Sequence, residues 1–439
     1  MTACSSSGAD IIALEGATLI DGSGGPPRHD AVILIKNGKI EAVARVNEIR
    51  VPRGARVMLL IGKTIIPGLV DAHAHVERWA VPRYLAWGVT TVRHVHGQAD
   101  SAIALARELN LGSLVGPRMF TAGAMIDGAA PTYPDASPAR NATEARRAVD
   151  QRALAGADFV KAYTKITPAL LTALVDEAAT LRMPVAAHLG KVDAVTAART
   201  GVASIEHLSG VVQAAARNGR AVSQAHDRFL AGWTAEERAW ATLDSAAVAR
   251  TARAVAQQGV TIVPTLVLHD VFARLNDRRM VSRAAMADVP PGATAGRVRD
   301  VNGLIRRAGW RDTDFQAFRR SRARQDQFVR EFKRAGGAIA AGSDAANQLL
   351  APGASLHEEL SLLVNAGLTP LEAITAATRR GAQLLRADSL GVIAPGRVAD
   401  LVVLNADPLR QIRATRDIEW VMLRGRIFRP DSIRGAWKQ

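Results

Sequence analysis

The chain has 439 residues, of which 48% are hydrophobic and 22% charged, and its net charge is +15. This length and apolar content exclude a disordered protein and a small scaffold that depends on disulfides. The single cysteine, Cys4, excludes intramolecular disulfides and thiolate metal clusters. No apolar run is long enough to cross a bilayer, and the first ten residues lack the charged and apolar regions of a signal peptide. A cytoplasmic globular protein is therefore expected.

The positive charge does not have the distribution of a nucleic-acid interface. Arginine supplies 48 of the 56 basic residues, a bias typical of a GC-rich genome, and no run of five basic residues occurs. Aromatic residues make up only 4% of the chain, too few for a platform on which bases stack. We expect a small-molecule substrate, no nucleic-acid or membrane partner, and a homo-oligomer.

Both ends of the chain are rich in predicted strands. Turn signals, such as the Asn37-Gly38 pair, separate short alternating or β-rich runs. The predicted strands are 13–21, 31–35, 39–44 and 400–404, and 420–428 is predicted to form a hairpin around Arg424-Gly425. This pattern predicts one small β domain assembled from both ends of the chain, residues 1–63 and 388–439.

The middle of the chain, 64–387, alternates short apolar runs with amphipathic helical segments such as 170–181 and 246–258. The apolar runs are 65–76, 89–94, 118–122, 158–163, 184–188, 203–208, 260–266 and 338–343. Nearly continuous apolar runs are typical of parallel strands buried on both faces. Eight strands alternating with helices predict an α/β fold, specifically a (β/α)8 TIM barrel over 64–387.

The connection between the seventh and eighth predicted strands, 267–337, is unusually long and helical. From Asp270 to Arg334 it holds 16 basic and 8 acidic residues, a net charge of +8. Because it follows a strand, it should lie on the C-terminal face of the barrel, where barrel enzymes place their active sites. It is interpreted either as a solvated helical hairpin or oligomer contact, or as a lid over an anionic group.

Polar residues of metal-binding types end several predicted strands. His73 and His75 lie two residues apart at the end of the first strand, so both imidazoles can face one cation. The later strands carry or end in Lys161, His188, His207 and Asp344. One histidine alone is more often a core residue, but six such residues in order along the chain, each at a predicted strand end, predict one metal centre at the barrel mouth.

This pattern resembles the amidohydrolase superfamily, specifically its imidazolonepropionase-like and Xaa-Pro dipeptidase-like branch. The resemblance covers nearly the whole chain and includes the segments TIIPGLVDAHAHV, GVTTVR, PVAAHLG, SIEHLSG, AGSDA and LGVIAPGRVADLVVLNADPL. It implies a (β/α)8 barrel joined to a small β-sandwich built from both termini, and an enzyme that hydrolyses an amide-type C–N bond.

The resemblance also implies the roles of the metal ligands. His73 and His75 would bind the more buried of two divalent ions, and His188 and His207 would bind the second. Lys161, carbamylated by carbon dioxide, would bridge the two ions, and Asp344 would ligate a metal and act as general acid and base. Zinc is the expected metal, because neutral imidazoles suit it.

Three further residues are candidates for binding substrate. Tyr163 lies two residues beyond Lys161 and shares its face, so it is expected near the mouth. His94, followed by His96, stands where relatives carry an Asp-Leu-Gly-type sequence, and His269 follows the seventh strand. For each, a packing or backbone-bonding role is the alternative. His226 and His357 are interpreted as structural.

Two other functions are compatible with this scaffold. The first is a mononuclear deaminase or cyclic-amide hydrolase, against which Lys161 argues, because mononuclear members generally lack a bridging lysine. The second is an inactive assembly scaffold, against which the complete ligand set argues. The sequence does not distinguish dipeptides, N-acyl amino acids, cyclic amides and xenobiotic amides, carbamates or ureas as substrates.

Overall fold

The computed structural model describes residues 11–437, which form an α/β structure with three sheets. Cys4 and the first ten residues, for which no signal peptide is expected, lie outside this range. Among the helices of 11–437, none combines the length and the apolar character needed to cross a membrane.

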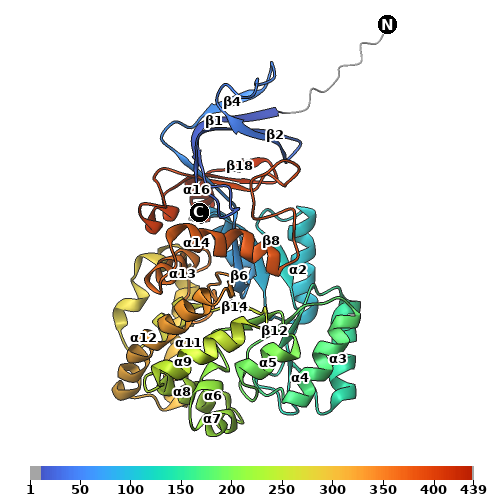
Figure 1. Ribbon diagram of the computed structural model, residues 1–439, viewed down its shortest axis with the longest axis vertical. Helices are drawn as coiled ribbons and strands as arrows, with labels where there is room; N and C mark the ends of the chain where they lie inside the picture. Colours follow the sequence, from blue (N-terminus) through green and yellow to red (C-terminus); the bar gives the residue numbers. More distant parts are fainter. Residues whose placement is uncertain (1–10, 438–439) are drawn as a thin grey trace.

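Strands from both ends of the chain form one mixed eight-stranded sheet, seen at the top of Figure 1. Its strands are β1 (Ile11–Leu19), β2 (Arg28–Lys36), β3 (Lys39–Arg45), β4 (Arg56–Leu59), β5 (Thr64–Pro67), β16 (Leu401–Leu404), β17 (Ile418–Leu423) and β18 (Arg426–Phe428). The order is β18-β17-β16-β5-β1-β2-β3, and β4 also pairs with β1. The predicted terminal strands are therefore confirmed, and β4 was not predicted.

The remaining strands form two parallel sheets, of three and seven strands. The first contains β6 (Leu69–Ala74), β7 (Val89–His94) and β8 (Arg118–Thr121). The second, in spatial order, contains β10 (Ser137–Pro138), β9 (Ile126–Asp127), β11 (Val160–Ala162), β12 (Val185–Ala187), β13 (Ser204–Glu206), β14 (Thr261–Val263) and β15 (Ala338–Ile339). Each of the eight predicted runs contains one of these strands.

The first predicted run, 65–76, is divided between two sheets at Gly68. The N–H of Gly68 donates to the carbonyl of Asp400 at 2.8 Å, which ties this point to the terminal sheet. A Cβ atom at Gly68 would lie 2.2 Å from Oγ1 of Thr90, so only glycine lets the chain pass so close to β7. The single predicted strand is therefore β5 in the terminal sheet followed by β6 in the parallel sheet.

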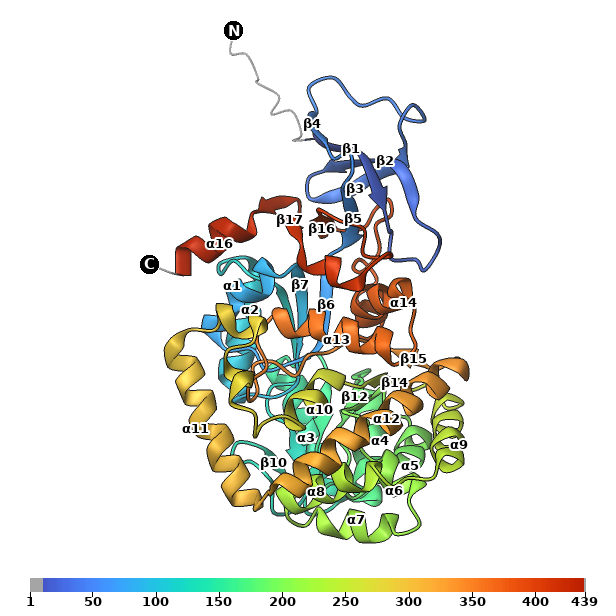
Figure 2. The ribbon, with the colours of Figure 1, turned by 90° about the vertical axis from the view of Figure 1, so that its left-hand side faces the viewer.

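Helices surround the parallel sheets (Figures 1 and 2). They are α1 (Val81–Ala86), α2 (Ala99–Leu111), α3 (Ala142–Ala155), α4 (Pro168–Thr180), α5 (Ala194–Thr200), α6 (Val211–Ala215), α7 (Gly219–Ala225), α8 (Phe229–Trp240), α9 (Ser245–Ala256), α10 (Leu266–Phe272), α11 (Pro291–Ala308), α12 (Asp312–Arg334), α13 (Ala354–Asn365), α14 (Pro370–Thr375), α15 (Gly381–Leu384) and α16 (Pro430–Trp437). The two helices predicted at 170–181 and 246–258 are α4 and α9. Thr167 and Asp244 cap them by accepting backbone N–H groups of the first turn.

The long connection 267–337 is helical, as predicted, and contains most of α10 followed by α11 and α12. Helix α12 buries Phe315, Phe318, Phe328 and Phe332 along one face, and it packs against α8 and α9. Helix α11 runs along the outside of the fold in Figure 2. The apolar face of α12 therefore anchors the charged connection to the core.

Candidate active site

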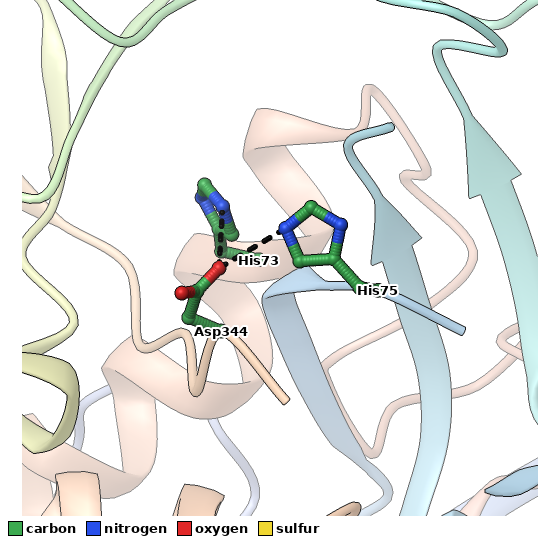
Figure 3. Close-up of side chains that lie close together, drawn as sticks. All are labelled: His73, His75 and Asp344. Atoms are coloured by element: carbon green, nitrogen blue, oxygen red, sulfur yellow. Dashed lines mark ion pairs between the residues drawn. The ribbon is translucent and has the colours of Figure 1, made fainter. Parts of the chain in front are cut away.

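Two histidines and an aspartate form the tightest cluster of ligand-type side chains. His73 lies in β6 and His75 directly follows that strand, so the two side chains, two residues apart, point to one face; Asp344 follows β15 (Figure 3). Oδ1 of Asp344 lies 3.2 Å from Nε2 of His73 and 3.1 Å from Nε2 of His75. The three ligand atoms lie within 4.8 Å of one another, a spacing that suits one metal ion.

The other three predicted ligands lie next to this cluster. The ring of His207 is 4.3 Å from that of His73 and 4.7 Å from that of His188, measured between centroids. Lys161, 2% exposed, lines the same cavity as these rings. Among the described residues, Nζ of Lys161 and Nε2 of His188 are buried with no hydrogen-bond partner. The structure thus brings together all six residues predicted from the strand ends.

Burial and neighbouring charges set the protonation of the cluster. Burial lowers the pKa values of His188 and His207 well below the usual range, so both rings are neutral and keep a lone pair for a metal. Burial lowers the pKa of Lys161 to about 8. Burial works against ionisation of Asp344, but hydrogen bonds from His73 and His75 outweigh it and hold the pKa of that carboxyl well below its usual range.

The sequence analysis missed Glu206, which is completely buried beside the cluster. Its Oε2 lies 2.6 Å from Nδ1 of His73, and its Oε1 accepts from Arg93 at 3.0 Å. Burial opposes its ionisation, but the charges of Arg93 and Lys161 outweigh burial and hold the pKa of Glu206 well below its usual range. The sequence feature that could have revealed this contact is a charged residue inside each of two otherwise apolar strands, Arg93 in β7 and Glu206 in β13.

A cavity of about 810 Å³ opens onto the cluster. Besides the ligands, its wall includes His96, Tyr133, Tyr163, Arg228, Phe229, Trp233, Leu268, Phe272, Arg297, Asp300, Leu304 and Arg307. Five of the residues along the wall belong to α11, at positions 297, 300, 304, 307 and 308. The connection after the seventh strand therefore reaches the cavity, as its place in the chain predicted.

Of the three predicted substrate-binding residues, Tyr163 lines the cavity and the two histidines do not. Tyr163 lines the cavity, with its ring 4.8 Å from that of His188. His94 is buried and accepts the N–H of Val76 at 2.9 Å, and His269 is buried between two acceptors. Neither His94 nor His269 is among the residues that line the cavity, so their assignment to substrate binding has no support in this geometry.

His96, whose role the sequence left open, does line the cavity. Its Nδ1 accepts the N–H of Met125 at 3.2 Å, and its Nε2 lies 3.3 Å from Oδ1 of Asp135. Its carbonyl oxygen accepts from Nδ1 of His75 at 3.3 Å. Burial and the neighbouring His75 lower the pKa of His96 to about 4, so this ring is neutral at pH 7.

An α/β fold with histidines, a lysine and an aspartate gathered at the carboxyl ends of parallel strands defines a class of metal-binding enzymes. Residues 64–428 match the amidohydrolase family, so the chain belongs to this family of metal-dependent hydrolases. It is accordingly a hydrolase that acts on carbon–nitrogen bonds. No protein in a comparison with curated sequences matches the chain.

Solved structures share the fold. A structure described as a Xaa-Pro dipeptidase with bound methionine in the active site is 22% identical, with a TM-score of 0.70 over 96% of this chain and 100% of that one. A putative prolidase from Bifidobacterium longum is 24% identical, with a TM-score of 0.71 over 98% of each chain. A bottromycin amidohydrolase is 23% identical, with a TM-score of 0.73 over 98% of this chain and 89% of that one.

Proposed function

We propose that the protein is a binuclear metal-dependent amidohydrolase that cleaves an amide-type C–N bond. The observation that carries this proposal is a pair of buried polar atoms that have no hydrogen-bond partner within the described residues, Nζ of Lys161 and Nε2 of His188. Unpaired buried polar atoms are costly, and a metal centre with a carbamylated Lys161 would account for both. The donor set of neutral imidazoles and oxygen ligands suits zinc.

His73, His75 and Asp344 would hold one ion, and His188 and His207 would hold the other. Lys161 would bridge them as a carbamate. In that modification a new N–C bond joins Nζ to carbon dioxide, and the nitrogen releases one proton. A pKa of about 8 supports this step, because part of the Lys161 population is then the neutral, nucleophilic amine near neutral pH.

When bound, the two ions would activate a water molecule and polarise the substrate carbonyl. The chain itself supplies the proton transfer and the walls of the site. Asp344 is held ionised, and its Oδ2 accepts from Nδ2 of Asn347 at 3.1 Å, which orients the carboxylate. It can take a proton from the attacking water and deliver it to the departing nitrogen. Tyr163 and His96 line the space beside the cluster, where a substrate would lie.

We further propose that the two parallel sheets close into one (β/α)8 barrel over 64–387. The N–H of Ala72 in β6 donates to the carbonyl of Ala341 at 2.9 Å, and the N–H of Asp158 donates to Thr121 at 2.8 Å. These bonds join the two sheets at both junctions. In the terminal sheet, Leu14 and Trp420 belong to one apolar cluster, which supports a β-sandwich domain of 1–63 and 388–439.

For the substrate, we propose the type of bond that is cleaved and the classes of molecule that contain it. The neighbouring structures are described as a dipeptidase, a prolidase and a bottromycin amidohydrolase. Together with a cavity of about 810 Å³, these names favour a dipeptide, an N-acyl amino acid or a larger amide over a very small molecule. Carbamates and ureas share the same reacting carbonyl group.

Metal analysis of the purified protein tests the proposal. Wild-type protein is expected to carry two zinc ions per chain, and a chelator should abolish amide hydrolysis. Lys161→Ala should lose most metal and activity. Lys165→Ala is the matched control, because Lys165 follows Lys161 by four residues but does not line the cavity, and its Nζ donates to the carbonyl of Ala130 at 2.7 Å. One ion per chain would indicate the mononuclear alternative, and active protein without metal would refute the proposal.

A further inference from the structure

The backbone of His207 has a conformation that needs support. Its φ angle is 58°, in the left-handed region that residues other than glycine rarely adopt. Such strained residues persist where the surroundings fix them, and they gather at functional sites. The ring of His207 is held by Thr265, whose Oγ1 lies 2.7 Å from Nδ1. Its carbonyl is held by a different side chain.

That side chain is His269 on α10, which is 2% exposed. Its Nε2 lies 2.9 Å from the carbonyl oxygen of His207, and its Nδ1 lies 2.6 Å from Oε1 of Glu237. A carbonyl oxygen only accepts, so Nε2 of His269 must donate to it. The ring therefore makes a directed bond to the backbone of a residue placed among the metal ligands.

Helix α8 fixes the orientation of the His269 ring. Glu237, 2% exposed, bonds Nδ1, and Gln325 of α12 donates to the other carboxylate oxygen at 3.3 Å. Trp233, one turn earlier on α8, stacks on the imidazole with a centroid distance of 5.8 Å and an interplanar angle of 8°. Trp233 also lines the cavity and makes an edge-to-face contact with the ring of His188, with centroids 5.8 Å apart. His269 thus connects the cavity wall with the backbone of His207.

We propose that His269 is a positioning residue of the metal centre, which holds the backbone of His207 so that its imidazole is directed at the metal. This inference rests on the proposed function, since it takes His207 to be a ligand. It replaces the sequence-based idea that His269 contacts substrate. Residues that orient metal ligands typically change metal affinity by about 10-fold to 100-fold when they are mutated.

The test uses full-length protein and compares His269→Phe with His357→Phe. Phenylalanine keeps an aromatic ring against Trp233 but has no donor. His357 is the matched control: it is also completely buried, and its Nε2 also bonds a backbone carbonyl, that of Trp87, at 2.9 Å. Zinc affinity is measured by competition with a chelator, and the visible spectrum of the Co²⁺-loaded protein reports ligand geometry. Thermal unfolding of the metal-free proteins reports stability.

His269→Phe is expected to weaken zinc binding by about 10-fold to 100-fold and to change the Co²⁺ spectrum. His269→Gln, which retains one donor, should recover part of both. His357→Phe should keep both within twofold of wild type even where its unfolding temperature falls. If His269→Phe does not fold, His269→Asn, too short to reach the carbonyl, takes its place.

A His269→Phe protein with wild-type zinc affinity and an unchanged Co²⁺ spectrum would overturn the inference and leave His269 as a core residue. That outcome leaves the proposed function intact as long as wild-type protein binds two ions. Failure of wild-type protein to bind metal would instead refute the proposed function.

Discussion

Nδ1 of His73 lies 2.6 Å from Oε2 of Glu206, and both side chains are shielded from solvent. A carboxylate only accepts, so Nδ1 of His73 carries a proton, and Nε2 is the ring nitrogen that faces Asp344 and the cavity and would bind a metal. Carboxylates that bond metal-ligating histidines in this way fix the ring and raise its basicity. Arg93 in turn holds Glu206 at 3.0 Å. One ligand of the proposed centre is therefore oriented by two charged residues that the cavity does not reach.

This relationship predicts the effect of Glu206→Gln. The amide cannot balance the charge of Arg93, and it bonds Nδ1 of His73 more weakly than a carboxylate. Metal affinity should fall by about 10-fold to 100-fold, measured by chelator competition. Glu236→Gln is the control, since Glu236 is also buried and bonds a histidine, His226, that is not a proposed ligand. Equal affinities in both variants would contradict the role of Glu206.

Asp344→Asn separates metal binding from proton transfer. The amide can offer one oxygen to a metal, but it cannot accept a proton from water. Metal content should stay near wild type while kcat falls by about 10²-fold to 10⁴-fold, the usual contribution of general acid–base catalysis. Asp300→Asn, on the cavity wall contributed by α11, should retain most of kcat. A kcat near wild type for Asp344→Asn would remove this residue from the mechanism.

The metal ligands could be found from the sequence because of a general property of parallel sheets. The carboxyl ends of neighbouring strands share one edge, so His188 and His207, which follow successive strands, lie close together without further information. Glu206 could not be assigned in this way. Its role depends on Arg93 and His73, which reach it across the sheets from distant parts of the chain.

The placement of His269 depends on local structure that the sequence pattern did not reveal. The apolar run 260–266 was expected to be strand throughout, but β14 ends at Val263 and α10 begins at Leu266. Thr265 between them has a left-handed φ of 45°, which redirects the chain. Periodicity does not distinguish a short strand from the first turn of a buried helix. As a result His269 meets the backbone of His207 and not the cavity.

Glu359 predicts how stability depends on pH. Burial raises the pKa of this carboxyl to about 7, although it accepts the N–H of Val267 at 2.7 Å. In the unfolded chain the pKa of a glutamate is about 4.3, so the folded protein binds this proton more tightly. The stability that results is fully present below about pH 4.3 and is lost as pH rises through about 7. Glu359→Gln removes this titration and keeps an acceptor for Val267. It should therefore be more stable than wild type at pH 8.5, by about 4 kcal/mol at most, but not at pH 4.

Denaturant unfolding at pH 4 and pH 8.5 measures this difference. Glu358→Gln is the control, because the neighbouring Glu358 is partly exposed and pairs with Arg283 at 3.3 Å. It should not remove the pH dependence. The same dependence in wild type and Glu359→Gln would mean that another group titrates in this range.

The arginines on the cavity wall predict a preference for anionic substrates. The connection from Asp270 to Arg334 carries a net charge of +8, and its helix α11 places Arg297 and Arg307 along the cavity. Arg297 is engaged by an ion pair with Glu77, which leaves Arg307 as the better candidate to meet a substrate. Positive charge at a concave mouth attracts anions, and a guanidinium binds a carboxylate through two parallel bonds.

Arg307→Met should therefore lower kcat/KM for an N-acyl amino acid by about 10-fold, and leave that of the corresponding methyl amide within twofold. Arg306→Met is the matched control, since Arg306 is, like Arg307, an exposed residue of α11 but does not line the cavity. The advantage of the carboxylate substrate in wild type should shrink as added salt reduces the screening length below about 10 Å. Equal kcat/KM values for the acid and the amide in wild-type protein would contradict this prediction. They would mean that the charge of α11 faces solvent and plays no part in substrate selection. Neutral amides, carbamates or ureas would then be the substrates to test.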